Sequence, residues 1–208
     1  MRYKKILMGC AGAVVITTLS GYGYVFVAGA PQFDGPRAEA FAGLNDKLEQ
    51  FQSAAMGTTR DYGVILPPDY AQHPQQRYPV IFLLHGGHDD ANAFTDKYGL
   101  ASVLHQLYTQ KKLPPSIVIM PDGNDNRGSS PLWDPQYFDG PNGRVGTLIG
   151  SELVKEVESR YRTLDDPKLW AIGGVSSGGW GAFNIGLRHL DHFKTVFSHS
   201  GYFTDDSG

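Results

Sequence analysis

Cysteine is almost absent from this sequence: Cys10 is the only one in 208 residues, and it lies within the first thirty. The remainder of the chain therefore has no disulfide, thiolate metal site or cysteine nucleophile available to it. Basic residues are also sparse. Without the first thirty residues, 15 Lys and Arg stand against 21 Asp and Glu. Because nucleic-acid binding favours a basic surface, we expect no nucleic-acid partner.

The first thirty residues have the pattern of an export signal. The basic cluster at residues 1–5 precedes an apolar run, and no charge follows that cluster before Asp34. A signal cleaved after the small residues 28–30 and an uncleaved anchor over residues 6–29 both fit, since the run is long enough to span a bilayer. We expect an exported protein, secreted, periplasmic or membrane-anchored, whose only membrane contact is this segment.

Residues 31–208 have the length and pattern of one α/β domain. Four short apolar runs end in glycine or a polar turn, which is typical of strands covered on both faces. Hydrophobic residues recur at helical spacing between them. The four runs are residues 78–87, 116–123, 169–175 and 195–201, and the helical spacing covers 100–108 and 149–161. This alternation predicts a mostly parallel central sheet with helices on both faces.

The segment before the first run also contains strand-like sequence. Residues 58–70 alternate polar and apolar side chains until two prolines, which is typical of a strand that ends in a turn. Residues 47–53 suit either a helix or a strand that pairs with the next one across residues 54–59. We favour the hairpin.

A Gly-x-Ser-x-Gly motif at residues 174–178 supplies the candidate nucleophile. It stands directly after an apolar run and before the apolar segment 181–187. A sharp strand-to-helix turn there would expose the Ser176 hydroxyl and aim the Ser177 amide at the charge that develops in acyl transfer. Ser177 does not fit as the motif serine, because Val175 stands two residues before it. A Gly/Ser turn whose hydroxyls only cap the helix is the structural alternative.

The sequence His85-Gly86-Gly87 ends another apolar run. Acyl transfer needs a second backbone donor, and glycines let the main chain approach a substrate closely. We choose the Gly87 amide as this donor, with Gly86 and His88 as neighbours that could replace it. A simple glycine turn leading into a helix is the structural alternative.

Six segments spread over residues 48–203 carry a family resemblance. They are VILPPDY, YPVIFLLHGG, SIVIMPDG, ELVKEVESRYR, GGVSSGGWGA and FSHSG. In this order they resemble the putative-esterase family of α/β-hydrolases, which includes S-formylglutathione hydrolases, feruloyl and acetyl-xylan esterases, enterochelin esterases and mycolyltransferases. The resemblance implies an α/β-hydrolase fold and an acyl-enzyme on Ser176, with the Gly87 and Ser177 amides as the oxyanion hole. We expect no metal and no cofactor.

The acid and the histidine that activate such a serine follow it in the chain of α/β-hydrolases, beyond the last strand expected here. Of the histidines after Ser176, His189 and His192 lie too far along the following helix, and His199 is more simply a strand-end residue. The resemblance therefore implies a chain truncated at its C-terminus, with the hydrolase domain of residues 31–208 lacking its last strands.

The sequence thus predicts an exported serine carboxylic-ester hydrolase for a small-molecule or polymer-linked ester. An acyltransferase of the same fold and a catalytically silent binding protein, which would lack the acid and histidine, are the alternatives. The long polar loop at residues 122–146 is a candidate substrate wall. Expected substrate contacts are His85, Gly86, His88, Trp133 and Asp134. The sequence carries no signal for an oligomeric state.

Overall fold

The structure is a computed structural model that describes residues 13–24, 44, 46–129 and 136–203. The chain divides into two compact units, Met1–Pro36 and Arg37–Gly208. Residues 13–24 of the first unit are helical. Among the described residues we find no helix whose length and apolar character would let it cross a membrane. Most of the segment expected to direct export, Cys10 included, lies outside the described residues.

The second unit is built on a six-stranded sheet with the order β1-β2-β4-β3-β7-β8. Its strands are β1 (Asp46–Ser53), β2 (Thr58–Ile65), β3 (Val80–Leu84), β4 (Ile117–Pro121), β7 (Trp170–Val175) and β8 (Thr195–His199). The four strands β4, β3, β7 and β8 run parallel, whereas β1 and β2 join as antiparallel neighbours. This arrangement confirms the expected mostly parallel sheet, and the four apolar runs are its parallel strands. The expected hairpin is the β1–β2 pair.

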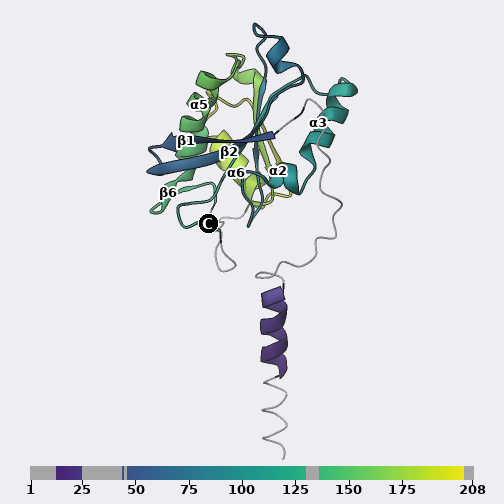
Figure 1. The fold of residues 1–208 in the computed structure, drawn as a ribbon. Coiled ribbons are helices and arrows are strands. Elements are labelled where there is room, and N and C mark those ends of the chain that lie inside the picture. The colour runs from purple at the N-terminus through teal and green to yellow at the C-terminus, as the bar shows by residue number, and fades with distance from the viewer. Residues whose placement is uncertain (1–12, 25–43, 45, 130–135, 204–208) are drawn as a thin grey trace, which may run out of the picture. The chain divides into compact units, whose positions relative to one another are not determined.

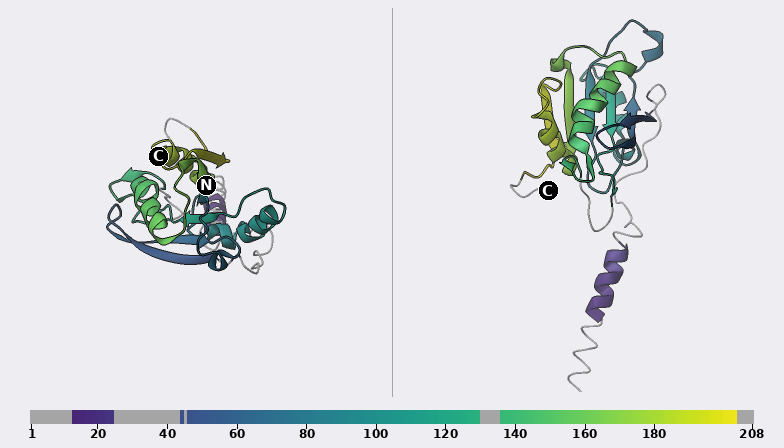
Figure 2. Two further views of the ribbon diagram at one scale, coloured as in Figure 1. Left: turned by 90° about the horizontal axis from the view of Figure 1, so that it is seen from above. Right: turned by 90° about the vertical axis from the view of Figure 1, so that its left-hand side faces the viewer.

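Helices cover both faces of this sheet, as expected (Figure 1). One face carries α2 (Ala93–Asp96) and α3 (Leu100–Thr109). The other carries α4 (Val145–Thr147), the π turn η3 (Leu148–Glu152), α5 (Leu153–Arg160) and α6 (Ser177–Gly186). The right-hand view of Figure 2 brings α5 in front of the sheet. Short 3-10 turns, η2 (Tyr70–Gln72) and η4 (Pro167–Leu169), lie in the connections.

Each face of the sheet has its own hydrophobic cluster. On the α5 and α6 face, Phe82 meets Phe193 edge to face with ring centroids 5.3 Å apart, and both side chains are fully buried. On the α3 face, Leu100 and Leu104 pack with Val118 of β4. Burial of both faces explains why β3, β4 and β7 are continuously apolar rather than alternating. The strand β8 differs from the expectation, because it lies at the edge of the sheet and its side chains are exposed or half-buried.

The helical repeat at residues 149–161 folds differently from a regular α-helix. Ile149, Leu153 and Val157 recur every four residues, and all three are fully buried. A repeat of four drifts around an α-helix, which has 3.6 residues per turn. The π turn η3 takes more residues per turn and so offsets this drift, which keeps all three side chains against the sheet.

The loop expected as a substrate wall contains a small ribbon of β5 (Asp139–Gly140) and β6 (Gly143–Arg144). It follows β4 at the edge of the sheet where the parallel strands end. The carboxyl ends of β3 and β7 lie at the same edge, since these strands are parallel and in register from Val80 and Trp170 to Leu84 and Gly174. The residues of the candidate site are therefore gathered at this edge.

Candidate active site

Ser176 lies at the sharp turn between β7 and α6. Its φ of 54° and ψ of −120° are rare for a residue with a side chain, and such a conformation costs on the order of 1–3 kcal/mol. Two backbone hydrogen bonds hold it. The Ser176 amide donates to the His199 carbonyl at 2.9 Å, and the Trp180 amide donates to the Ser176 carbonyl at 3.2 Å. The turn is thus fixed from β8 on one side and from α6 on the other.

The glycines of the motif allow α6 to approach the ends of the strands. A Cβ on Gly174 would lie 2.4 Å from the backbone of Gly178. A Cβ on Gly178 would lie 2.1 Å from the carbonyl oxygen of Leu84. Because these neighbours are backbone atoms that cannot rotate away, only glycine fits at either position. The Gly-x-Ser-x-Gly spacing therefore reflects the close packing of the turn against β3.

The loop after β3 lies beside Ser176. A Cβ built on Gly86 would stand 3.7 Å from the Ser176 Cβ and 3.7 Å from the Tyr98 hydroxyl. Within the described residues, the amides of Gly87 and Ser177 have no recorded hydrogen-bond acceptor. Ser177 begins α6, so its amide is one of the free donors at a helix N-terminus. The structure thus places the expected nucleophile close to both expected oxyanion donors.

His85 occupies a different environment from the one expected. Its side chain is 1% exposed, so the ring lies inside the protein rather than at a surface where substrate would touch it. The Gly123 amide donates to Nε2 at 2.9 Å, and Nδ1 lies 2.8 Å from the Gly86 carbonyl oxygen. Since Nε2 accepts, Nδ1 carries the proton and donates to Gly86. His85 therefore links the loops that follow β3 and β4.

Three further residues, His88, Trp133 and Asp134, were expected to contact substrate. His88 is exposed, with φ of 59° and Nδ1 3.0 Å from the Ser129 hydroxyl oxygen. It stands directly after the loop that holds Gly87. Trp133 and Asp134 lie outside the described residues.

A partly buried ion pair supports the loop after β4. Arg60 of β2 donates to the Asp122 carboxylate at 3.0 Å and to the Asn124 carbonyl at 2.6 Å. Burial acts to raise the pKa of Asp122. The Arg60 guanidinium and the Asn124 amide, which both donate to the carboxylate, act to lower it. The net effect is a pKa of Asp122 below its ordinary value.

Sequence reasoning missed two buried residues of the site, Gln136 and Tyr137. The Tyr137 hydroxyl donates to the His85 carbonyl at 2.7 Å, and its ring packs against Gly123 and Gly181. Gln136 contacts Ser177. Both belong to the loop expected only as a substrate wall, and neither lies in a periodic pattern that would have marked it.

The base that would activate Ser176 is not identified by contacts among the described residues, where the Ser176 hydroxyl has no hydrogen bond to a histidine. The exposed His199 accepts a hydrogen bond from the Ser176 amide through its backbone carbonyl. His189 lies beyond the end of α6, where its ring faces Gly150. In the described part of the chain no group of three or more histidine, cysteine or acidic residues is arranged to bind a metal.

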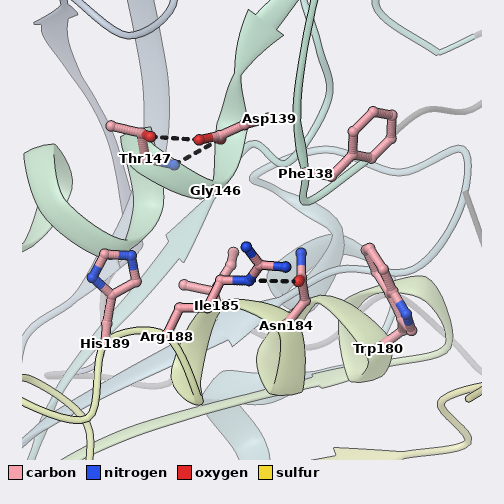
Figure 3. Close-up of a pocket in the computed structure, with 9 residues that line it drawn as sticks. All are labelled: Phe138, Asp139, Gly146, Thr147, Trp180, Asn184, Ile185, Arg188 and His189. Atoms are coloured by element: carbon pink, nitrogen blue, oxygen red, sulfur yellow. Dashed lines mark hydrogen bonds between the residues drawn. The ribbon is translucent and has the colours of Figure 1, made fainter.

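An open cavity of about 360 Å³ runs beside α6 (Figure 3). Trp180 and Asn184 line it from successive turns of the helix and Arg188 from just beyond its end, with Phe138 and Asp139 opposite. Trp180 lies one turn after Ser176, so the cavity extends away from Ser176 along α6. A second, mostly apolar cavity of about 340 Å³ borders Val175 and His199 on the other face of the sheet.

Comparison with known proteins gives consistent matches. Residues 53–206 match the family model described as "Esterase: Putative esterase". The chain is 33% identical over 154 residues to "Esterase Rv1288" of Mycobacterium tuberculosis strain H37Rv, a match that covers 73% of this chain and 31% of that protein. Its fold is similar to that of a ferulic acid esterase, with a TM-score of 0.68 and 28% identity over 78% of this chain and 63% of that one.

A further solved structure, an S-formylglutathione hydrolase from Staphylococcus aureus, matches with a TM-score of 0.57 and 20% identity. This match covers 78% of this chain and 60% of the hydrolase. The chain thus spans about a third of the mycobacterial relative and less than two thirds of each solved structure. These structures share the α/β-hydrolase fold expected from the sequence.

Proposed function

Because the chain belongs to the Putative esterase family, we propose that it is a serine carboxylic-ester hydrolase that forms an acyl-enzyme on Ser176. The observation that carries this proposal is the strained turn that holds Ser176 beside Gly86. A backbone conformation this unfavourable persists only where the surrounding structure fixes it, and such positions cluster at active sites. A turn that only caps a helix would not require it.

The proposed reaction has two steps. The Ser176 oxygen attacks the carbonyl carbon of the ester, and the electron pair of the C=O bond moves to the carbonyl oxygen. The Gly87 and Ser177 amides donate to this oxyanion, and the partial positive charge at the N-terminus of α6 stabilises it further. The intermediate then collapses and the alcohol leaves. Water releases the acid from the acyl-enzyme by the same route.

A general base must take the Ser176 proton and return it to the leaving alcohol. The proposal assigns the nucleophile and the oxyanion donors, and it assigns no base among the described residues. Loss of one oxyanion donor lowers kcat about 10²–10³-fold in serine hydrolases, so these backbone amides are a large part of the proposed catalysis.

We further propose that the substrate is an ester outside the cytoplasm, either a small molecule or a group linked to a polymer. The export-like pattern of the first thirty residues supports this location. The similarity to a protein described as a ferulic acid esterase supports an ester substrate.

The test uses protein expressed from its complete natural gene. We expect hydrolysis of p-nitrophenyl acetate and covalent labelling by a fluorophosphonate probe. Ser176→Ala should abolish the labelling and lower kcat/KM by about four orders of magnitude or more. Ser159→Ala, which removes an exposed hydroxyl on α5, is the matched control and should leave both unchanged. Equal rates and labelling in the wild type and Ser176→Ala would reject the proposal.

A further inference from the structure

The side-chain amide of Gln136 joins the two segments that carry the proposed oxyanion donors. The Ser177 hydroxyl donates to Gln136 Oε1 at 2.6 Å. Gln136 Nε2 donates to the Asn124 side-chain oxygen at 3.0 Å and, more weakly at 3.4 Å, to the Gly86 carbonyl. Gln136 is only 5% exposed. One buried amide therefore connects the start of α6 to the loop after β3.

Two hydrogen bonds to the Gly86 carbonyl, a shorter one from His85 and a longer one from Gln136, fix where the next amide points. In a trans peptide the C=O of one residue and the N–H of the next point in opposite directions, and none of the described peptide bonds is cis. Gln136 and His85 both hold the Gly86 carbonyl toward the interior. The Gly87 N–H is thereby turned to the opposite side, and no acceptor for it is recorded in the described part of the chain.

The orientation of the Gln136 amide is itself fixed. The Asn124 amide nitrogen donates to the Asp122 carboxylate at 2.8 Å and to the Asp89 carbonyl at 2.9 Å, so the Asn124 oxygen must face Gln136. The Asn124 oxygen is an acceptor, so the Gln136 atom that faces it is the donor Nε2 and not the acceptor Oε1. If Oε1 and Nε2 of Gln136 exchanged places, Gln136 Oε1 would face Asn124 Oδ1, and two acceptors would meet without a proton between them. A chain of oriented groups thus runs from the Asp122 carboxylate to Ser177.

We propose that Gln136 is a positioning residue of the oxyanion hole. It holds the Gly87 and Ser177 amides in the relative positions that let both donate to one oxyanion. This inference rests on the proposed function and deepens it. Gln136 touches no reacting atom. It acts through the Gly86 carbonyl and the Ser177 hydroxyl, so its effect falls on the transition state, where the oxyanion forms, rather than on substrate binding.

The main test compares Gln136→Leu with the wild-type protein from its complete gene, with p-nitrophenyl acetate as substrate. We expect kcat to fall about 10–100-fold, less than for the loss of a donor, with KM changed by less than about threefold. Thr163→Val is the matched control, because Thr163 is equally buried but lies beside Tyr78 at the opposite edge of the sheet. It should leave kcat unchanged.

A second readout separates positioning from general loss of structure. Phenylboronic acid adds to a serine hydroxyl and forms a tetrahedral anion that needs the same amides. Its inhibition constant should weaken in Gln136→Leu by about the same factor as kcat/KM falls. An unchanged inhibition constant, or a change confined to KM, would overturn the proposal. An inactive wild type that is not labelled at Ser176 would instead reject the proposed function, and this inference with it.

Two further variants keep the test decisive if Gln136→Leu does not fold. Ser177→Ala, the gentler one, removes the hydroxyl that donates to Gln136 Oε1. Gln136→Glu keeps that acceptor but replaces Nε2, the donor to Asn124 and Gly86, with an oxygen. Both should lower kcat with KM nearly constant. In the double variant Gln136→Glu with Ser177→Ala, the losses should be smaller than the product of the single effects, because both residues act through one connection. If the loss of kcat in the double variant equals the product of the two single losses, the two residues act independently and the proposal is contradicted.

Discussion

Gly178 of α6 lies directly against the Leu84 carbonyl oxygen at the end of β3, so closely that a Cβ on Gly178 would stand 2.1 Å from that oxygen. This contact brings the start of α6, which carries the Ser177 amide, against the strand that leads into His85, Gly86 and Gly87. The helix and the loop therefore meet backbone to backbone, and the separation of the two proposed oxyanion donors depends on this contact.

Gly178→Ala should destabilise the fold, because the added methyl meets backbone atoms that cannot rotate away. We expect a loss of about 3 kcal/mol or more in the free energy of unfolding, measured by urea denaturation. Gly140→Ala is the control. Its Cβ would approach only the Phe138 ring, at 3.1 Å, so that variant should change stability by about 0.5 kcal/mol or less. Equal stabilities for the two variants would contradict the close-packing argument.

The pair Tyr137 and Tyr78 offers a matched test of buried hydroxyls. Both are 2% exposed or less, but Tyr137 donates to the His85 carbonyl at 2.7 Å, whereas the Tyr78 hydroxyl has no hydrogen-bond partner among the described residues. Tyr137→Phe should cost about 1–2 kcal/mol, since it leaves a buried carbonyl without its donor. Tyr78→Phe should be neutral or stabilising, because it removes an unsatisfied buried group. Thermal or urea unfolding of both variants checks this, and the reverse order would refute it.

Asp122 should make the fold sensitive to acid. Its pKa lies below the ordinary value in the folded state, so the native protein favours the ionised form. The resulting stabilisation is complete above the ordinary aspartate pKa of about 4 and is lost as the pH falls through the folded-state pKa. Asp122→Asn should therefore destabilise the protein by about 2–3 kcal/mol at pH 7, with a smaller difference from wild type at pH 3.

Urea unfolding at the two pH values measures this difference. The exposed Asp165 provides the control variant Asp165→Asn, which should change stability by about 0.5 kcal/mol or less at either pH. A gap between wild type and Asp122→Asn that grows on acidification would show that the sign is wrong.

Local patterns in the sequence predicted the sheet, its parallel strands, the helices and the serine turn. Continuous apolar runs identify strands buried on two faces, and the glycines around Ser176 identify a turn that no larger residue can make. Gln136 and Tyr137 escaped because their partners, Ser177 and His85, are 41 and 52 residues away in the chain. A side chain whose role depends on such a distant partner leaves no periodic signal.

His85 illustrates a further limit of sequence reasoning. Its place beside Gly86 and Gly87 suggested contact with substrate, and the loop that follows His85 does lie beside Ser176. Whether a side chain at a strand end points outward or inward depends on the neighbouring loop, and here the Gly123 amide and the Gly86 carbonyl hold the His85 ring inside. The ring instead connects the loop after β3 to the loop after β4.

Glu152 anchors the β1–β2 hairpin to the π turn η3. Its two carboxylate oxygens accept from the Ser53 hydroxyl at 2.5 Å and from the Ala55 amide at 2.9 Å. Because hydrogen bonds to a charged acceptor are stronger than neutral ones, Glu152→Ala should destabilise the protein by about 2 kcal/mol. Glu158→Ala, at an exposed position on α5, should have little effect.

The loss in Glu152→Ala should be local in origin, since both hydrogen bonds of the carboxylate go to residues at the hairpin turn, Ser53 and Ala55. Amide hydrogen exchange should speed up in β1 and β2 more than in β3 and β7, which lie inside the sheet. The effect should also reach the site, because β2 carries Arg60, whose guanidinium holds Asp122. Faster exchange spread evenly over all strands would mean that Glu152 stabilises the whole domain rather than the hairpin.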